Sequence, residues 1–209
     1  MKNNLPSKSL MRCKNLALVA ATLLLGACGV AAVVQPGQPV KVRDLTVVSP
    51  ISWSQFGSAR ERTWTLDGGL LNQLGIFTDV KDGEHLFLAR RSGRQRRGEG
   101  PLFRASMDAL EVQELFADAL KSAGLANLST SNLRPAKFGQ REGFRFDLQF
   151  ESGSGASLGA RGGLRYRAMV LAEVSGGTLS YLYFDAPEEY YCARDQASVE
   201  AIFASVRAE

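Results

Sequence analysis

Histidine and cysteine, the side chains that most often act as general bases and nucleophiles in enzymes, are scarce in this sequence. The 209 residues include one histidine, His85, and three cysteines. A Ser-His-Asp triad, a Cys-His pair or a histidine-containing metal site would therefore have to use His85. His85 directly follows a turn signal at residues 81–84, where a histidine is usually solvated or caps the turn. We therefore expect no enzyme activity, no catalytic residue, no metal site and no cofactor.

Two interpretations of Cys192 are open. It lies just before the last expected helix and close to Arg194. A helix N-terminus and a cation can lower the pKa of a thiol and make it reactive. Alternatively, Cys192 is a small buried side chain beside Tyr190 and Tyr191, and we favour this interpretation. A thiol enzyme or an unusual hydrolase centred on Cys192 or His85 is thus the least favoured hypothesis.

Cys28 ends the tetrapeptide Leu25-Gly26-Ala27-Cys28, which closes a short apolar run. A branched apolar residue, two small residues and a cysteine resemble the lipobox of bacterial lipoproteins. The resemblance implies cleavage before Cys28 and a diacylglyceryl group on its sulfur, with a further acyl chain such as palmitate on its amine. Each buried methylene contributes about 0.8 kcal/mol, so two or three chains would hold the protein on a membrane.

Residues 1–27 have the features of a signal-peptide helix. The apolar core at residues 16–25 is too short to span a bilayer as a stable helix. The residue after Cys28 is Gly29 rather than aspartate, which favours the periplasmic face of the outer membrane if the cell has two membranes. The basic residues that precede the core are Lys2, Lys8, Arg12 and Lys14.

The basic character of the chain belongs to this leader. The whole chain has 25 basic and 21 acidic residues. Removing residues 1–27 takes away four basic residues and no acidic one, so the mature chain would carry 21 of each. Net charge therefore gives no reason to expect a nucleic-acid partner.

The densest local charge lies within residues 90–104, where Glu99 is the one acid among arginines. Guanidinium groups bind phosphates and carboxylates through two parallel hydrogen bonds. A lipid headgroup, a lipopolysaccharide phosphate, an anionic cell-wall polymer or an acidic protein would suit this loop, although charge runs are most often solvated surface. The candidate binding residues are Arg90, Arg91, Arg94, Arg96 and Arg97, followed by Arg104.

The mature chain is expected to have two parts. Residues 28–43 would be the lipidated cysteine and a flexible tether, because two prolines and a glycine at 36–39 oppose regular structure. Residues 44–209 would be a single domain, long enough to bury a proper core. Cys13 leaves with the leader and Cys28 is lipidated, so no internal disulfide is expected.

Strand patterns dominate both halves of this domain. β-favouring residues predict strands at 45–49 and 63–66, and residues 70–80 favour a strand over a short helix. An Asp-Gly pair at 82–83 predicts a hairpin that continues into 86–88.

The strongest strand signal is the strict alternation of Phe144, Phe146, Leu148 and Phe150 within residues 142–151. One face of this strand must be buried. The other face is expected to meet water or a polar partner; it carries Arg145, Asp147, Gln149 and Glu151. A strand region at 125–137 precedes it, a Gly/Ser-rich connection spans 153–163, and a Gly176-Gly177 turn predicts a hairpin of 164–174 with 178–184.

Two helices are predicted by apolar residues at helical spacing. The first spans about 108–123, with Ser106 as its N-cap and Gly124 after its end. The second spans 196–206. The stripe of the first helix is Leu110, Leu115, Phe116, Ala119 and Leu120. The fold class is therefore α+β, an antiparallel meander with helices packed on it.

Three pieces of the second half carry a further resemblance: 138–144 (FGQREGF), 174–177 (VSGG) and 202–206 (IFASV). In the order helix, strand, Phe-alternating strand, hairpin and closing helix, residues 108–207 resemble the PsbP-like superfamily. That superfamily includes the extrinsic protein of photosystem II and a Ran-binding nuclear import factor, and some bacterial lipoproteins of unknown function are similar. The resemblance implies an α/β/α sandwich and carries over no catalytic residue, since its members act mainly as binding or assembly factors.

The sequence thus predicts a cell-envelope lipoprotein anchored through Cys28, with a non-enzymatic domain that binds a partner protein or assists assembly. The alternative is capture of an anionic lipid or glycan through the arginines of residues 90–104. The partner itself is not specified by the sequence.

Overall fold

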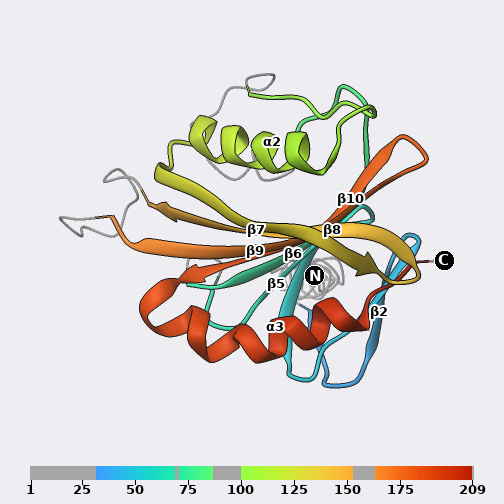
Figure 1. The fold of residues 1–209 in the computed structure, drawn as a ribbon. Coiled ribbons are helices and arrows are strands. Elements are labelled where there is room, and N and C mark those ends of the chain that lie inside the picture. Colours follow the sequence, from blue (N-terminus) through green and yellow to red (C-terminus); the bar gives the residue numbers. More distant parts are fainter. Residues whose placement is uncertain (1–31, 69–70, 87–99, 153–162, 209) are drawn as a thin grey trace, which may run out of the picture. The chain divides into compact units, whose positions relative to one another are not determined.

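The computed structural model describes residues 32–68, 71–86, 100–152 and 163–208 (Figure 1). Two groups of candidate residues lie outside these ranges: the lipobox Leu25, Gly26, Ala27 and Cys28, and the arginines Arg90, Arg91, Arg94, Arg96 and Arg97. The connection at 153–162 also lies outside them.

Most described strands form one eight-stranded sheet in which all neighbours are antiparallel, in the order β1-β4-β5-β6-β10-β9-β8-β7. The strands are β1 (Ala32–Val34), β4 (Trp53–Ser58), β5 (Glu61–Thr65), β6 (Gln73–Lys81), β7 (Ala126–Phe138), β8 (Arg141–Glu151), β9 (Arg165–Ser175) and β10 (Thr178–Pro187). A smaller sheet, in the order β11-β3-β2, contains β2 (Pro39–Val42), β3 (Leu45–Val48) and β11 (Arg207–Ala208).

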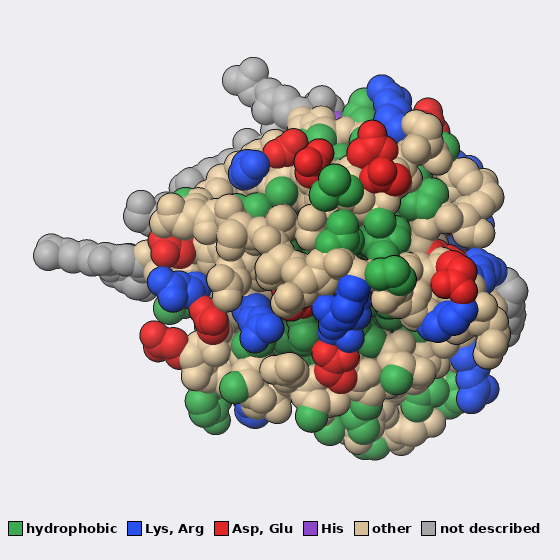
Figure 2. All heavy atoms as spheres, in the orientation of Figure 1, with side chains coloured by type: hydrophobic (Ala, Val, Ile, Leu, Met, Phe, Trp, Pro, Cys, Tyr) green, Lys and Arg blue, Asp and Glu red, His purple; other side chains and the backbone are tan. Residues whose placement is uncertain are grey.

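Each face of the large sheet is covered. Figure 1 shows α2 (Ala109–Ser122) over one face and α3 (Ala193–Ser205) against the other. One apolar core lies between the sheet and α2, and a second lies between the sheet, α3 and the small sheet. The α+β class and the α/β/α sandwich are confirmed, with helix, strands, hairpin and closing helix in the expected order. Figure 2 shows acidic and basic side chains interspersed across one face of the molecule.

Strand β8 shows why the sandwich needs two helices. Its phenylalanines face α2, where Phe116 packs edge-on against Phe146 with ring centroids 5.4 Å apart. The prediction that the other face meets water or a polar partner is only partly right: Gln149 is exposed, but α3 lies against Arg145. Arg145 on that face donates two hydrogen bonds to Glu200 of α3, at 2.7 and 2.8 Å, and Asp147 is only 6% exposed.

Helix α2 begins at Ala109, close to the predicted start, but its N-cap lies two residues later than predicted. Its N-cap is Asp108, not Ser106, and it forms a capping box: the Asp108 carboxylate accepts from the Glu111 N–H at 2.9 Å, and the Glu111 carboxylate accepts from the Asp108 N–H at 2.8 Å. The reciprocal pair satisfies two backbone donors, which a cap at Ser106 would leave unbonded. The predicted stripe is buried apart from Leu110, which is 53% exposed.

The predicted domain boundary at residue 44 is wrong. The compact unit begins at Ala32, since β1 pairs with β4 and β2 pairs with β3. The Gly37 N–H donates to the Ser49 carbonyl at 2.8 Å, so the Pro/Gly segment is a turn between strands rather than a tether. Three apolar side chains of β1 and β2 are buried: Val34, Val40 and Val42.

The prediction that the turn at 81–84 joins two paired strands of a hairpin is also wrong. The turn forms, but both sides of β6 are already occupied, by β5 and β10. Glu84 instead accepts from the Phe103 N–H at 2.8 Å, and His85 bridges to Leu102. Of the expected returning strand, residues 87–88 lie outside the described residues.

The remaining expectations for the second half are largely confirmed. The β9–β10 hairpin turns at Gly176 and Gly177, both with positive φ (57° and 79°). Helix α3 begins at Ala193, three residues before the expected start, after one π-helical turn at Glu188–Cys192. Within the described ranges, no helix has the length and apolar character needed to cross a membrane.

Candidate functional site

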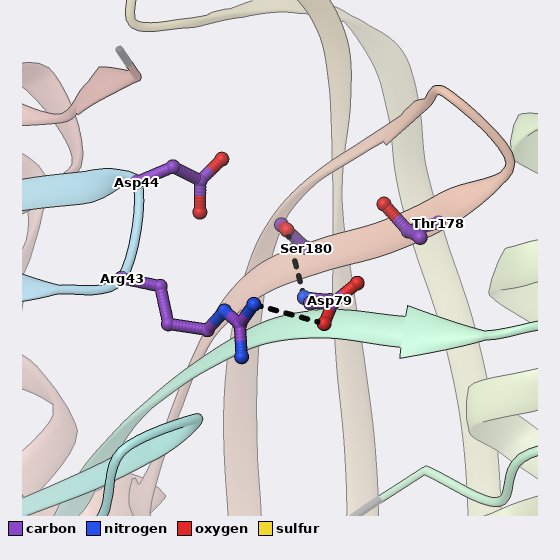
Figure 3. A pocket seen from close by; sticks show the side chains of 5 residues that line it. All are labelled: Arg43, Asp44, Asp79, Thr178 and Ser180. Carbon is purple, nitrogen blue, oxygen red and sulfur yellow. Dashed lines mark hydrogen bonds and ion pairs between the residues drawn. The ribbon is translucent and has the colours of Figure 1, made fainter.

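A polar hollow of about 640 Å³ lies where the small sheet meets the end of β6 and the start of β10 (Figure 3). Arg43 and Asp44 extend from the turn between β2 and β3. Asp79 of β6 and Ser180 of β10 stand opposite them. The fifth lining residue is Thr178.

The β2–β3 turn is tight, because Val42 and Leu45 are already a strand pair. Arg43 therefore adopts a φ of +56°, a left-handed conformation that favours glycine. The turn places a guanidinium and a carboxylate side by side, both facing the large sheet (Figure 3). Such a conformation in a non-glycine residue costs roughly 1 kcal/mol and is often found at functional sites.

The opposite wall is a β-bulge. Ser180 of β10 stands opposite two residues of β6, because the register shifts between the pairs Leu179–Val80 and Tyr181–Phe77. Asp79, with a φ of +57°, is the bulged residue, and its N–H donates to the Ser180 Oγ at 3.3 Å. Its carboxylate lies 3.5 Å from the Arg43 guanidinium. Bulges of this kind aim a side chain out of the regular pleat.

Arg60 stabilises the bulge through hydrogen bonds to its backbone. Its guanidinium donates to the Thr78 and Asp79 carbonyls, which the bulge removes from the strand ladder. Arg60 also pairs with Glu84 at 2.6 Å. The hydrogen bond from Arg60 lowers the pKa of the Glu84 carboxyl, so this clamp is ionised at neutral pH.

The line of charges continues from the hollow into the sheet. Arg141, at the start of β8, lies 3.6 Å from the Asp44 carboxylate and 2.8 Å from one oxygen of Glu173. Glu173 pairs with Ser180 across β9 and β10 and is only 1% exposed. Its second oxygen, Oε2, is buried without a hydrogen-bond partner in the part of the chain described. Burial raises the pKa of Glu173, although Arg141 opposes this.

Carboxylates and guanidiniums thus alternate from Asp79 through Arg43, Asp44 and Arg141 to Glu173. Each of these charged groups has an opposite charge within 4 Å. Within residues 32–68, 71–86, 100–152 and 163–208, no group of three His, Cys, Asp or Glu side chains could hold a metal ion.

The two candidates for covalent chemistry have structural roles. The His85 Nδ1 lies 3.0 Å from the Pro101 carbonyl oxygen, and Nδ1 must be the donor because a carbonyl only accepts. Cys192 is 3% exposed and belongs to the core beneath α3. Burial raises the pKa of its thiol. The favoured interpretation, a small buried side chain, is confirmed by its position in the core.

The residues around the hollow were not among those singled out from the sequence. Glu173 could have been found: it is the one charged residue in the apolar stretch 168–174, and a buried charge needs a partner. Arg43, Asp79 and Ser180 gave no such signal, because a hairpin turn, a bulge and a neighbouring strand bring them together.

No family model matches the chain, and no curated protein matches it. Several solved structures are similar, and three of them follow. A cyanobacterial PsbP from Synechocystis sp. PCC 6803 is 10% identical over 88% of this chain and 96% of its own, with a TM-score of 0.49. LpqN, involved in cell envelope biogenesis of Mycobacterium tuberculosis, is 12% identical over 84% and 88%, with a TM-score of 0.33.

A Bacteroides thetaiotaomicron protein is 11% identical over 86% of this chain, with a TM-score of 0.43. The chain spans about half of that protein, 49% of its length. At these identities and TM-scores, the similarities assign no activity or partner to this chain.

Proposed function

We propose that this protein is a lipid-anchored, non-enzymatic component of a bacterial cell envelope whose domain binds a partner protein. The observation that carries the proposal is the lipobox ending at Cys28, which only three residues separate from the first strand of the domain at Ala32. Gly29 after the lipidated cysteine favours the outer membrane in a cell with two membranes, and palmitate is the expected acyl chain on the amine.

The polar hollow is the surface we assign to the partner. Arg43 and Asp79 are 48% and 24% exposed, and they are held by a tight turn and a clamped bulge rather than by flexible loops. Pre-positioned charges reduce the ordering cost of binding and favour a partner of complementary charge. His85 and Cys192 are the two groups most able to start covalent chemistry. The His85 Nδ1 is hydrogen-bonded to a backbone carbonyl and Cys192 is buried in the core, which supports a binding role.

The experiment has two arms. In the first, Cys28→Ser should move the protein from the membrane to the soluble fraction of the producing cell. In the second, native membranes carrying the wild type are cross-linked and compared with Arg43→Gly, which removes the guanidinium at a position whose φ suits glycine. Lys121→Gln, an exposed cation on α2, is the matched control.

A protein captured by the wild type and the control but lost with Arg43→Gly is the expected result. If Arg43→Gly captured the same protein as the wild type, the hollow would not be the partner-binding surface. Turnover of a substrate by the purified protein, abolished by one point substitution, would overturn the non-enzymatic role.

The second candidate function is binding of an anionic lipid or glycan through residues 90–104. One described residue favours it: the Arg104 side chain is 53% exposed, and its ion pair with Asp82 is long, at 3.8 Å. Replacing the five arginines from Arg90 to Arg97 with serine should abolish vesicle or glycan binding, and that binding should weaken with salt. Unchanged binding by this variant would eliminate the candidate.

A further inference from the structure

Two large apolar side chains are exposed together at one edge of the eight-stranded sheet. Val33, in the edge strand β1, is 56% exposed, and Phe56, in the adjacent strand β4, is 50% exposed. Val34 and Trp53 are strand partners, and both are buried in the core on the α3 side. Because side chains alternate along a strand, Val33 and Phe56 share the opposite face of the sheet.

The helix on that face does not extend to this edge. Helix α2 packs mainly on β7 and β8, at the other end of the sheet, and its core reaches Phe77 of β6. Val33 and Phe56 lie beyond it, in the two strands farthest from β7. This edge, defined by Val33 and Phe56, is therefore an apolar surface that the described helices leave uncovered.

The N-terminal sequence restricts what can lie against this edge. Only residues 29–31 separate Cys28 from Ala32, so the four steps between them reach at most about 14 Å even when fully extended. The run from Gly29 to Val34 reads GVAAVV and contains no charged or polar side chain. A domain that stood away from its membrane would need a longer and more polar connection than this one.

From these observations we infer that the β1–β4 edge rests on the lipid bilayer, with Val33 and Phe56 in its interfacial region. The inference rests on the proposed lipid anchor at Cys28. Two side chains would bind a membrane weakly when the protein is free in solution. A tether of three residues, however, converts the contact into an intramolecular one with a high effective concentration of bilayer. Every anchored molecule meets the bilayer, whereas a protein partner would have to reach the same narrow space.

The opposite edge provides an internal control. Strands β1 and β7 are separated by seven strand spacings, which is roughly 34 Å along the sheet. Thr130, exposed in the middle of β7, should therefore stay away from the lipid when β1 contacts it. Substitutions F56W and T130W place a fluorescent probe at each edge. The native Trp53 and Trp64 are 1% and 0% exposed and give the background, measured on the wild type.

The test uses protein processed by a bacterial host from the full-length gene, purified from its membranes and reconstituted into phosphatidylethanolamine–phosphatidylglycerol vesicles with brominated acyl chains. Flotation of the vesicles reports the anchor, and tryptophan quenching by bromine reports the contact. We expect the F56W probe to be quenched several-fold more strongly than T130W, with its emission shifted to shorter wavelength. Adding a V33D substitution should reduce this quenching while flotation is unchanged.

Other outcomes separate the two claims. Protein that floats but shows equal or no quenching at both probes keeps its anchor and overturns the membrane contact. A blue-shifted F56W emission without bromine quenching would mean that a second copy or another protein covers the edge, which also overturns it. Protein that does not float overturns the proposed anchor, and the contact, which depends on the short tether, falls with it.

Discussion

The ion pair between Arg145 of β8 and Glu200 of α3 should contribute measurably to the stability of the fold. Both of its hydrogen bonds are short, at 2.7 and 2.8 Å, and it joins the sheet to the closing helix. The Arg145 side chain is 17% exposed and its Nε already lacks a partner in the part of the chain described. In Glu200→Ala, the nearly buried Arg145 guanidinium would lose the carboxylate that neutralises it.

The size of the effect follows from the exposure of the two partners. Breaking a fully buried ion pair costs about 3–5 kcal/mol, and breaking an exposed one costs less than about 1 kcal/mol. Because Glu200 is 40% exposed, we expect a loss of about 2 kcal/mol in the free energy of unfolding. With a urea m-value of about 2 kcal/mol/M, the midpoint should fall by roughly 1 M.

The pH dependence gives a second signature. The hydrogen bond from Arg145 lowers the pKa of Glu200, so the folded state holds the carboxylate more strongly than the unfolded state does. The stabilisation by the Arg145–Glu200 pair is therefore complete above the pKa that Glu200 has in the unfolded chain. It is lost as the pH falls through the pKa that Glu200 has in the folded protein. The difference between wild type and Glu200→Ala should accordingly shrink between pH 6 and the acid limit of folding.

Urea unfolding followed by circular dichroism measures both effects, with Glu114→Ala as the control. Glu114 is an exposed glutamate within α2, so the change in helix propensity is matched and its own effect should stay within about 0.5 kcal/mol. If the two variants lose equal stability at pH 7, the ion pair adds nothing. A deficit of Glu200→Ala that persists unchanged at low pH would assign the loss to packing instead of charge.

Four further results are expected. Burial raises the pKa of Glu173, so the stability of the wild type relative to Glu173→Gln should fall as the pH rises from 4 to 7, and parallel unfolding curves would refute this. Arg43→Gly should be more stable than Arg43→Ala by about 0.5–1 kcal/mol, because the φ of Arg43 is +56°; an equal or reversed order in thermal unfolding would contradict the strained turn. Phe116→Ala should cost about 3–5 kcal/mol in urea unfolding, since Phe116 is fully buried against Phe146; a loss under about 2 kcal/mol would show that the core collapses around the gap. A thiol reagent should label Cys192 only after unfolding, and rapid labelling of the native protein would show that the thiol is accessible.

Local patterns were sufficient to predict most regular elements of the second half of the fold, but not the strands β1, β2 and β4 of the first half. The alternating phenylalanines of β8, the stripe of α2 and the glycine turn of the β9–β10 hairpin each depend on residues close in sequence. The sequence did not predict that α3 packs on the second face of β8, because this helix lies more than forty residues later in the chain. Arg145 was expected to face water or a polar partner, and its partner is Glu200 of that helix.

The hollow and the domain boundary were missed for related reasons. Asp79 reaches Ser180 only because β6 and β10 are neighbours with a bulge between them, and neither the neighbourhood nor the bulge is visible in the sequence. The Pro/Gly pattern at 36–39 was correctly seen to oppose regular structure, but such residues also make the turn that lets β1 and β2 join two different sheets. The position of Ala32 then makes the connection to Cys28 short, which is the basis of the inferred membrane contact.

The central claim is that this domain is held on a membrane by a lipid at Cys28, and the mass of its N-terminal peptide tests it most directly. The account predicts that the first tryptic peptide of the membrane-extracted protein begins at Cys28 and ends at Lys41, with the added mass of a diacylglyceryl group and an amide-linked acyl chain. A peptide with an unmodified Cys28, or one that still carries residues of the leader, would contradict it.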